Sequence, residues 1–438
     1  MVSLPELRVL LLCVVGLAWL PACQSTVDPL ADLVIHGARV WDGTGAPMGA
    51  PAVVQVGGGR IISVEPLEDV DIASAESAGV SVVDASGSYI IPGLINAHGH
   101  VAGTWSVERS GTYGEFAAME LARYARFGVT SVNSLGGDRE GSFALRDASW
   151  GEEGPARARL LVAGPVVTGA NPEELTLAVD AVARAGPDWI KIRVDDNLGT
   201  TTKMSPASYG AVIDRARTHG LRVASHLFYH EDAKGLLRAG TGLVAHSIRD
   251  ESVDDETIGL FLETGVCYVP TLTREVSTFA YGEHPDFLDD PFLMSDVDSV
   301  QVQVVSDPAR QALVRASGAA EAYGRALEIA QDNLARLVEA GVPVAFGTDS
   351  GPMGRFQGYF EHMETELMAE AGLSAEQILR SATAVAAECL GRDDIGTLEE
   401  GRRADFIVLR ANPLADLANL REIDGVWIGG VRIEGSRK

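Results

Sequence analysis

Six polar side chains in the sequence could take part in metal-dependent chemistry, and each stands near the end of a predicted strand. They are His98, His100, Lys191, His226, His246 and Asp349. Imidazole and carboxylate groups suit zinc or a similar metal of borderline softness. His98 and His100 are two residues apart, so they lie on the same side of an extended chain. A single histidine would more often be a core residue, but six such groups at the ends of five strands indicate a metal centre.

The alternation of a strand places Lys191 inside the predicted fold. Ile190, Ile192 and Val194 share one face of their strand, which should pack on helices, so Lys191 and Arg193 point the other way. A lone lysine buried among apolar groups would be an unpaired charge, which is costly. The sequence therefore predicts that Lys191 takes part in the same centre as the histidines.

The elements that must position these groups follow a repeating pattern. An apolar run of about five residues recurs eight times, and most of these runs are followed by a segment of helical periodicity. The runs lie in 90–100, 128–135, 158–167, 188–194, 221–228, 242–248, 265–272 and 342–349. Eight such units predict an α/β fold of the (β/α)8 TIM-barrel type, with reactive groups at the C-terminal ends of the strands. The alternative is a doubly wound open sheet, but no glycine-rich phosphate loop follows the first run.

Both ends of the chain are β-rich, with short runs broken by Gly, Asp and Pro turns. We expect one small β-sandwich domain formed by both chain ends, from residues 31–90 and 391–438, around a barrel over 91–390. The long stretch 281–307, between the seventh strand and its helix, is either a lid over the barrel mouth or a surface excursion.

The chain resembles the amidohydrolase superfamily over nearly everything after residue 31. The resemblance rests on VVDASGSYIIPGLINAHGH at 82–100, on DIGTLEEGRRADFIVL at 394–409, and on the order of the six strand-end residues. More narrowly, the chain is similar to the imidazolonepropionase- and prolidase-like branch that uses a lysine on the fourth strand.

This resemblance implies two divalent metal ions, most simply Zn²⁺. His98, His100 and Asp349 would hold the more buried ion, and His226 and His246 would hold the more exposed one. Lys191, carboxylated by CO2, would bridge the two ions. Burial lowers the pKa of a lysine and supplies the neutral amine that reacts, and the carbamate is then an anionic oxygen ligand.

The resemblance also implies a binuclear-metal amidohydrolase that cleaves a small amide or peptide bond in a dipeptide or an N-acyl amino acid. A hydroxide that bridges the metals would attack the carbonyl group. Asp349 would accept its proton and then deliver it to the leaving nitrogen.

Such a substrate carries a carboxylate, which suits an arginine. Candidate substrate-binding residues are Arg193, Arg249 and Arg274, each of which could instead pair with the acidic residue near it, Asp195, Asp250 or Glu275. Tyr229 could donate to the substrate carbonyl or the oxyanion. Related dipeptidases tend to carry this tyrosine two positions after the fifth-strand histidine, where this chain has Phe228.

Other functions remain open on the same residues. A lactonase or a phosphoester hydrolase could use the same metal pair. A deaminase is disfavoured, because such relatives use one metal and a glutamate close behind the fifth-strand histidine, whereas Glu231 comes five residues after His226. A ligand-binding lipoprotein without catalysis is less expected, because all six ligand residues are present.

The N-terminus predicts export. Residues 9–20 form an apolar run that is too short to span a bilayer and typical of a signal peptide over 1–22. Leu20-Pro21-Ala22-Cys23 resembles a bacterial lipobox, so we expect lipidation of Cys23 and an anchor at a bacterial membrane, in the outer membrane facing the periplasm. Ordinary secretory cleavage is the alternative. Cys267 and Cys389 would then remain as buried, unreactive thiols.

The composition is that of a globular protein, with 46% apolar and 22% charged residues. Asp and Glu outnumber Lys and Arg by 61 to 35, which gives a formal net charge of −26. Because so negative a surface repels phosphate backbones, no nucleic-acid partner is expected. The expected partner is a small-molecule substrate. The resemblance also allows a homo-oligomer.

Overall fold

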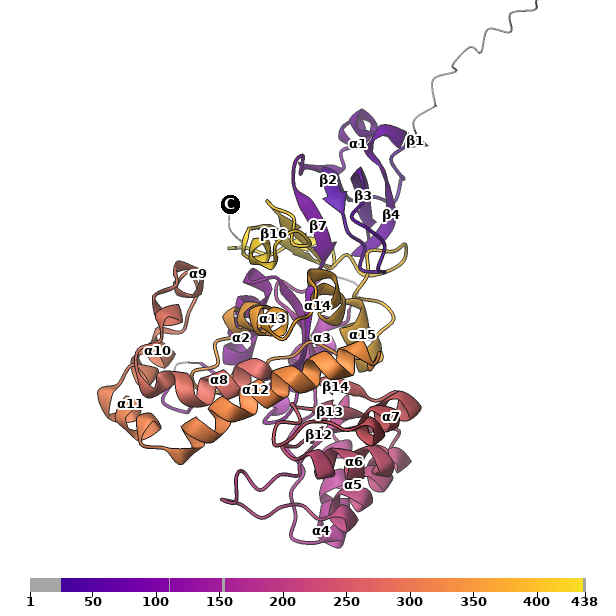
Figure 1. The fold of residues 1–438 in the computed structure, drawn as a ribbon. Helices are drawn as coiled ribbons and strands as arrows, with labels where there is room; N and C mark the ends of the chain where they lie inside the picture. Colours follow the sequence, from indigo (N-terminus) through magenta and orange to yellow (C-terminus); the bar gives the residue numbers. More distant parts are fainter. Residues whose placement is uncertain (1–24, 110, 152–153, 436–438) are drawn as a thin grey trace, which may run out of the picture.

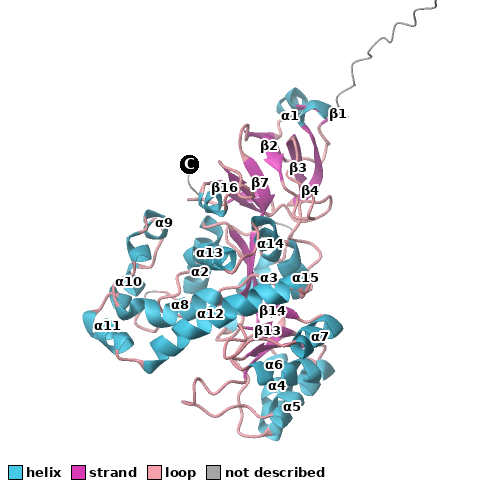
Figure 2. Ribbon diagram, in the orientation of Figure 1, coloured by secondary structure: helices cyan, strands magenta, loops and turns pink. Residues whose placement is uncertain are grey.

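The computed structural model describes residues 25–109, 111–151 and 154–435. The predicted signal peptide over 1–22 and the lipidation site Cys23 lie outside these residues. Strands from both chain ends gather in the upper part of the molecule in Figure 1, and the α/β part lies below them. Figure 2 shows the strands of the α/β part flanked by helices. Within the described chain, no helix is long and apolar enough to cross a membrane.

The upper part is a single mixed sheet of eight strands from both chain ends. Its strands are β2 (Leu33–Val40), β3 (Pro51–Gly57), β4 (Arg60–Pro66), β6 (Ser81–Asp84), β7 (Tyr89–Pro92), β15 (Phe406–Leu409), β16 (Ile423–Ile428) and β17 (Val431–Arg432). The order is β17-β16-β15-β7-β2-β3-β4, with β6 on β2. The ends meet where β15 pairs with β7 in antiparallel fashion, Phe406 opposite Pro92. Buried Ile and Val side chains and the stacked rings of Phe406 and Trp427 form its core.

The α/β part contains two parallel sheets. One has the order β10-β9-β8 and the other the order β11-β12-β13-β14. The strands are β8 (Leu94–Gly99), β9 (Val129–Ser134), β10 (Arg159–Val162), β11 (Trp189–Arg193), β12 (Arg222–His226), β13 (Leu243–Ala245) and β14 (Cys267–Val269). Seven of the eight predicted strands are therefore present. A separate two-stranded pair joins β1 (Ser25–Thr26) to β5 (Val70–Asp71).

The eighth predicted strand, within 342–349, forms only an isolated parallel bridge between Val344 and Tyr268 of β14. One reason is that Pro343 has no N–H group to donate to a ladder. Backbone hydrogen bonds still connect this segment on both sides. Toward β14, the Tyr268 N–H donates to Pro343 O at 3.0 Å and the Ala345 N–H donates to Tyr268 O at 2.9 Å. Toward β8, the Ala97 N–H donates to Phe346 O at 2.8 Å. The two sheets are also connected between β10 and β11, where the Asp188 N–H donates to Val162 O at 2.8 Å.

Helices follow most of the strands. The α-helices are α1 (Ile72–Ala78), α2 (Tyr113–Arg126), α3 (Glu140–Ser149), α4 (Pro172–Ala183), α5 (Pro206–Thr218), α6 (His230–Ala239), α7 (Asp255–Thr264), α8 (Leu272–Phe279), α9 (Pro291–Met294), α10 (Ser299–Val305), α11 (Pro308–Arg315), α12 (Gly318–Glu339), α13 (Tyr359–Glu370), α14 (Ala375–Ser381) and α15 (Ala384–Leu390). Short 3₁₀ turns are η1 (Leu67–Asp69), η2 (Ala280–Gly282), η3 (Asp286–Asp289) and η4 (Leu417–Arg421). Side-chain caps begin many helices, as in the Thr112–Glu115 capping box of α2.

Alternation along the strands separates two apolar layers. Ile190 and Ile192 of β11 pack outward with helix residues such as Val212. The opposite faces of the strands meet in a second cluster, to which Ile95, Ala97, Leu135, Leu161, Ala163, Trp189, Ala224, Leu243, Ala245, Cys267, Val269 and Ala345 belong. Trp189 therefore shares its face with Lys191, and the predicted inward direction of this face agrees with the packing.

Residues 281–307 pack against the rest of the protein. Their apolar side chains join Phe127, Phe356, Tyr359 and Phe360 in one cluster over α2 and α13. The Gly354 N–H donates to the side-chain oxygen of Gln301 at 3.0 Å, so this segment also contacts the loop that follows Asp349. Its role as a lid stays a prediction.

Cys267 and Cys389 form a disulfide, with 5.9 Å between their Cα atoms. The expectation that both remain free thiols is therefore wrong. The two residues are 122 positions apart, on β14 and α15. Only the packing of α15 against the interior cluster brings them together, so no local pattern in the sequence could indicate the pair.

Replacing Cys267 and Cys389 together by serine is expected to lower the free energy of unfolding by about 2–4 kcal/mol, because the closed loop is long. Denaturant unfolding of the oxidised protein measures this loss. Reductant should produce a similar loss in the parent and none in the double variant. Equal unfolding midpoints for the oxidised parent and the variant would contradict a stabilising role for this bond.

Candidate metal centre

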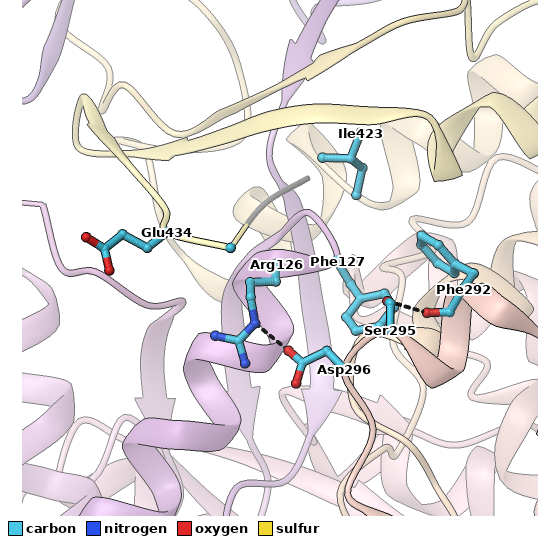
Figure 3. Close-up of a pocket in the computed structure, with 8 residues that line it drawn as sticks. Arg126, Phe127, Phe292, Ser295, Asp296, Ile423 and Glu434 are labelled. Atoms are coloured by element: carbon cyan, nitrogen blue, oxygen red, sulfur yellow. Dashed lines mark hydrogen bonds and ion pairs between the residues drawn. The ribbon is translucent and has the colours of Figure 1, made fainter. Parts of the chain in front are cut away.

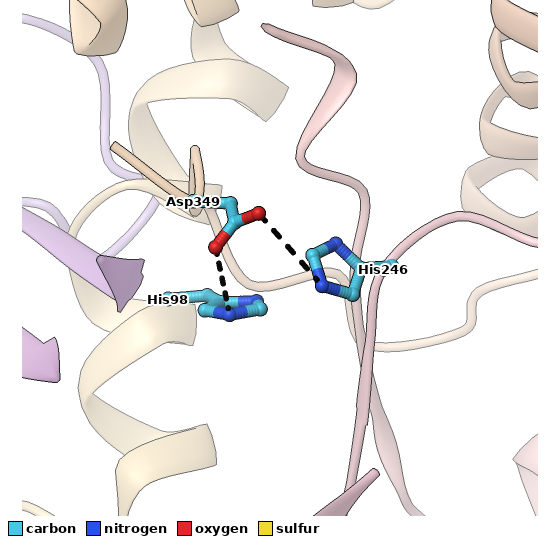
Figure 4. Close-up of side chains that lie close together, drawn as sticks. All are labelled: His98, His246 and Asp349. Carbon is cyan, nitrogen blue, oxygen red and sulfur yellow. Dashed lines mark ion pairs between the residues drawn. The ribbon is translucent and has the colours of Figure 1, made fainter. Parts of the chain in front are cut away.

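His98, His246 and Asp349 form a compact cluster. One potential ligand atom from each lies within 4.8 Å of the others, and all three residues are buried. Asp349 faces both rings in Figure 4: its Oδ1 is 3.4 Å from His98 Nε2, and its Oδ2 is 4.0 Å from His246 Nε2. The residues come from β8, the end of β13 and the segment of the eighth predicted strand. The C-terminal ends of parallel strands therefore converge here, as the barrel pattern requires.

The other three expected ligands adjoin this cluster. His100 Nε2 is 2.7 Å from Asp349 Oδ1. The buried Lys191 Nζ lies 3.4 Å from His98 Nε2. The His226 ring is centred 4.1 Å from the ring of His246. All six side chains that the sequence singled out thus lie in one connected group.

The backbone at this group is strained. His246 has a φ of 142° and Asp349 a φ of 56°, values that non-glycine residues rarely adopt. Thr271, with a φ of 52°, places its hydroxyl 2.7 Å from His246 Nδ1. Such strain collects at functional sites, where the surrounding structure must hold it.

Glu361 of α13 holds the turn that carries Asp349. One of its carboxylate oxygens accepts hydrogen bonds from Asn96, Thr348 and Ser350 at 2.6, 2.7 and 2.6 Å. The Asn96 side-chain oxygen in turn accepts the His98 N–H at 2.9 Å. A single buried carboxylate therefore connects β8 to both neighbours of Asp349. Only its tertiary contacts distinguish Glu361 from other helix glutamates, so no pattern in the sequence indicates its role.

Gly347 shows why a small residue precedes this turn. A Cβ atom at this position would lie 2.8 Å from the His98 backbone nitrogen and 2.5 Å from Val269 Cγ1. Contacts this short do not occur for real Cβ atoms. A larger residue would therefore push β8 and its histidine away from Asp349.

A second buried carboxylate, Glu364, supports the turn at Thr271. It accepts the Leu272 N–H at 2.7 Å and the Thr273 N–H at 2.8 Å. The Thr273 hydroxyl is close to both Glu364 Oε2 and Thr348 O but has only one hydrogen. A proton on Glu364 resolves this, because Glu364 then donates to Thr273 and Thr273 donates to Thr348. Burial raises the pKa of Glu364 to about 8, which agrees with a protonated group.

Replacing Glu364 by glutamine is expected to remove part of the pH dependence of stability. In the parent, the unfolded chain loses the proton near pH 4.5 and the folded chain near pH 8, so the contribution of Glu364 to stability falls as pH rises between these values. Glutamine has no such proton. As pH rises toward 8, the parent should therefore lose unfolding free energy relative to the variant, on the order of 1 kcal/mol per pH unit. Above pH 8 the difference between the two proteins should stay constant.

Denaturant titrations of the metal-free proteins from pH 5 to pH 9 measure this difference. Glu339→Gln, on the exposed surface of α12, is the matched control and should follow the parent at every pH. Parallel stability curves for the parent and Glu364→Gln would mean that Glu364 is ionised in the folded protein.

The protonation states suit metal ligands. Burial lowers the pKa of His226 to about 3 and the pKa values of His98 and His246 well below the usual value. These rings are therefore neutral, which is the form that binds a metal ion. Burial raises the pKa of Asp349, but Arg355 and His100 outweigh this effect and hold the pKa well below its usual range. Burial lowers the pKa of Lys191 to about 7.

The hydrogen bonds of the histidine ring nitrogens also fit a metal ion. His100 faces an acceptor with each ring nitrogen: Nδ1 is 2.9 Å from Gly136 O, and Nε2 is 2.7 Å from Asp349 Oδ1. A neutral imidazole has only one N–H to donate. His98 Nδ1 is buried and has no hydrogen-bond partner among the described residues. His226 Nε2 is also buried, and its nearest charged neighbour is Asp195, whose Oδ1 lies 3.1 Å away. Cations among these nitrogens and Asp349 would satisfy groups that protein atoms leave unmatched.

Arg355 is a charged neighbour of Asp349 that the sequence analysis missed. Its Nη1 donates to Asp349 Oδ2, and its Nε donates to the Ser277 hydroxyl at 2.9 Å. The residue lies in the Gly-rich loop after the eighth predicted strand. Its one signal in the sequence is a lone arginine six positions after Asp349, beyond the strand end.

The three arginines expected to bind substrate differ in their surroundings. Arg249 is fully buried, with Nε 3.1 Å from Glu275 Oε1 and Nη1 bonded to two backbone oxygens. Arg274 pairs with Glu275 at 3.0 Å and donates to the Tyr323 hydroxyl at 3.2 Å. Arg193 pairs with Asp195 at 3.0 Å, and 42% of its side chain is exposed. Arg249 thus pairs with Glu275 of α8 and not with its neighbour Asp250.

Tyr229 lies at the start of α6 and points to another loop. Its hydroxyl donates to Asp196 Oδ1 at 2.7 Å, and Lys203 Nζ lies 4.4 Å from the centre of its ring. Burial and Asp196 raise the pKa of Tyr229, so the hydroxyl remains protonated. No contact with the six clustered residues appears among its described interactions, and its role toward substrate stays a prediction.

A cavity of about 550 Å³ lies away from this centre (Figure 3). It is lined by Arg126, Phe127, Phe292, Ser295, Asp296, Ile423, Glu434 and Gly435. An ion pair between Arg126 and Asp296 crosses its wall. None of its lining residues belongs to the metal centre.

Comparison with known proteins gives a consistent result. The model of the amidohydrolase family matches residues 89–433. An uncharacterized protein of Mycobacterium tuberculosis is 26% identical over 379 residues, which cover 83% of this chain and 90% of that protein. An imidazolonepropionase of Cutibacterium acnes is 25% identical over 377 residues, or 82% of this chain and 84% of that protein. The structure of a putative prolidase from Bifidobacterium longum is similar with a TM-score of 0.72 and 25% identity, over 93% of this chain and 96% of the other.

Proposed function

Because this chain belongs to the amidohydrolase family, we propose that it is a binuclear metal-dependent hydrolase. Its reaction is the cleavage of a carbon–nitrogen bond in a small amide or peptide, such as a dipeptide or an N-acyl amino acid. The similarity to a putative prolidase and to an imidazolonepropionase supports this class of bond.

One observation carries the proposal, namely the convergence of six ligand-type side chains at the ends of the strands. His98, His246 and Asp349 lie within 4.8 Å of one another. Lys191 is buried beside His98 without a carboxylate within ion-pair distance in the described chain. A lysine in this place is costly as an isolated cation, and carboxylation converts it into an anionic ligand.

Each side chain then has a distinct task. His98, His100 and Asp349 would hold one ion, His226 and His246 would hold the other, and carboxylated Lys191 would be a ligand shared by both. When bound there, two divalent ions, most simply Zn²⁺, would supply Lewis acidity and activate water as a nucleophile at neutral pH. Asp349 is ionised and buried, so it can accept a proton during attack and return it to the leaving nitrogen.

A closed (β/α)8 barrel is the proposed scaffold. The interior cluster supports it, because it joins residues from six of the seven strands with Leu135, directly after β9, and with Ala345. The backbone hydrogen bonds on both sides of the 342–349 segment support it as well, as does the hydrogen bond from the Asp188 N–H to Val162 O.

Export with a lipid anchor on Cys23 remains part of the proposal. The apolar run at 9–20 and the lipobox-like Leu20–Cys23 favour it. The Cys267–Cys389 disulfide agrees with an oxidising compartment such as the periplasm. The mass of the N-terminal peptide from membrane fractions tests it: a diacylglycerol group on Cys23 supports the anchor, and a free N-terminus elsewhere excludes it.

The decisive experiment is a substrate screen with the purified protein loaded with Zn²⁺ and bicarbonate. Amino-acid release from a library of dipeptides and N-acyl amino acids is measured, with Asp349→Asn as the blank. Release by the parent and not by the variant supports the proposal. Turnover of lactones or phosphoesters without any amide cleavage would replace it with those reactions.

A further inference from the structure

Arg355 is held beside the acid that the proposed reaction uses. Its Nη1 donates to Asp349 Oδ2, and its Nε is fixed by Ser277 of α8 at 2.9 Å. The loop before it is tight, because the Arg355 N–H donates to Pro352 O at 2.9 Å and the Gly351 N–H donates to Arg355 O at 2.8 Å. These contacts leave the guanidinium little freedom, so its position relative to Asp349 is set by the fold.

Arg355 also keeps donor capacity for a ligand. Its side chain is 18% exposed, and Nη2 makes no hydrogen bond with the described residues. Arg249 is fully buried, forms an ion pair with Glu275 and donates hydrogen bonds to backbone oxygens. Arg274 donates to Glu275 and to the Tyr323 hydroxyl. Among these three arginines, Arg355 alone combines a contact to Asp349 with partial exposure.

Cleavage of an N-acyl amino acid requires a proton donor for the leaving nitrogen and, close to it, a cation for the carboxylate. Its leaving nitrogen and its carboxylate are bonded to the same Cα atom, so they are separated by two covalent bonds of about 1.5 Å each. The residue that protonates the nitrogen and the cation that binds the carboxylate must therefore be neighbours. Asp349 and Arg355 are such a pair, and the planar fork of arginine matches a carboxylate.

We propose that Arg355 binds the carboxylate of the leaving amino acid, so that the enzyme acts on N-acyl α-amino acids and dipeptides and discriminates against uncharged amides. This inference rests on the proposed function and adds to it the residue that binds the substrate carboxylate. Arg355 is then a substrate-binding residue, and its contact with Asp349 places the leaving nitrogen next to the acid.

The test compares two substrates on the parent protein and its variants. One substrate is the best N-acyl amino acid from the screen, and the other is the same compound with its carboxylate converted to a neutral carboxamide. We expect kcat/KM of the parent to favour the acid by about 10- to 100-fold, as for loss of a charge-assisted hydrogen bond. Arg355→Met should abolish this preference, and Arg355→Lys should keep part of it.

Arg109→Met is the matched control. Arg109 is 19% exposed and pairs with Asp298 at 2.7 Å, so it resembles Arg355 in exposure and pairing but has no described contact with Asp349. This variant should keep the full preference for the acid. Arg193→Met tests the alternative residue. If Arg193→Met loses the preference for the acid and Arg355→Met keeps it, the inference is overturned in favour of Arg193.

The comparison separates binding from positioning. If Arg355→Met slows both substrates equally and keeps the preference, Arg355 only positions Asp349 and the inference is wrong. If the parent cleaves acid and amide equally well, the inference fails without any variant, while the proposed amide hydrolysis stands. If the parent cleaves neither member of any pair, the proposed function fails and the inference with it. Thermal unfolding checks that each variant is folded. Inhibition of the parent by the free amino acid, but not by its amide, is a second measure of carboxylate binding.

Discussion

Replacing Asp349 with asparagine is expected to lower kcat by about 10³-fold or more, because the variant loses both a metal ligand and the group that carries the proton. Asparagine keeps an oxygen of similar size and place but cannot accept and return a proton. Arg355 and His100 both contact the carboxylate of Asp349, and both contacts weaken when its negative charge is removed. Steady-state kinetics on the best amide substrate, with metal content measured on the same samples, give the result.

Metal content distinguishes the two roles of Asp349. A variant that holds two ions and still loses activity shows that proton transfer is the missing function. A variant that holds two ions and keeps more than about a tenth of kcat would remove Asp349 from proton transfer. Asp180→Asn is the control, since Asp180 pairs with Arg215 at 2.6 Å on the outer helices and should leave kcat unchanged.

The protein is expected to bind two divalent ions per chain only when CO2 is present to carboxylate Lys191. Burial lowers the pKa of Lys191 to about 7, so a substantial share of the amine is neutral and reactive at neutral pH. Without carboxylation, the site lacks the anion that offsets the charge of a second ion. Metal-free protein reconstituted in decarbonated buffer should therefore hold fewer ions and show a large loss of activity that bicarbonate restores.

Two readouts test this apart from activity. Protein treated with ¹³C-labelled bicarbonate should show a carbamate carbon signal that is absent from Lys191→Met. Lys234→Met is the control, because Lys234 pairs with Asp254 at 2.7 Å on the rim and has no described contact with the metal centre. Two ions bound equally well with and without CO2, and no labelled carbamate, would contradict a bridging role for Lys191.

Much of the fold and the centre follows from local patterns in the chain. Period-two alternation places Lys191 inward, because successive side chains of a strand point to opposite faces. The recurrence of strand and helix predicts that His98, His226 and His246 all stand at one end of parallel strands, and the structure brings them together there. These inferences succeed because each depends on a few consecutive residues and on the geometry of one strand.

Contacts between distant segments were decided by the packing of whole elements. Cys267 and Cys389 meet across 122 positions, Glu361 reaches Asn96 across 265 positions, and Arg249 pairs with Glu275 rather than with its neighbour Asp250. Arg355 reaches Asp349 only because its loop folds back over the strand end. The residue types at the strand ends thus identify a metal centre, whereas the charges and hydrogen bonds that hold it depend on how helices and loops dock, which no local spacing encodes.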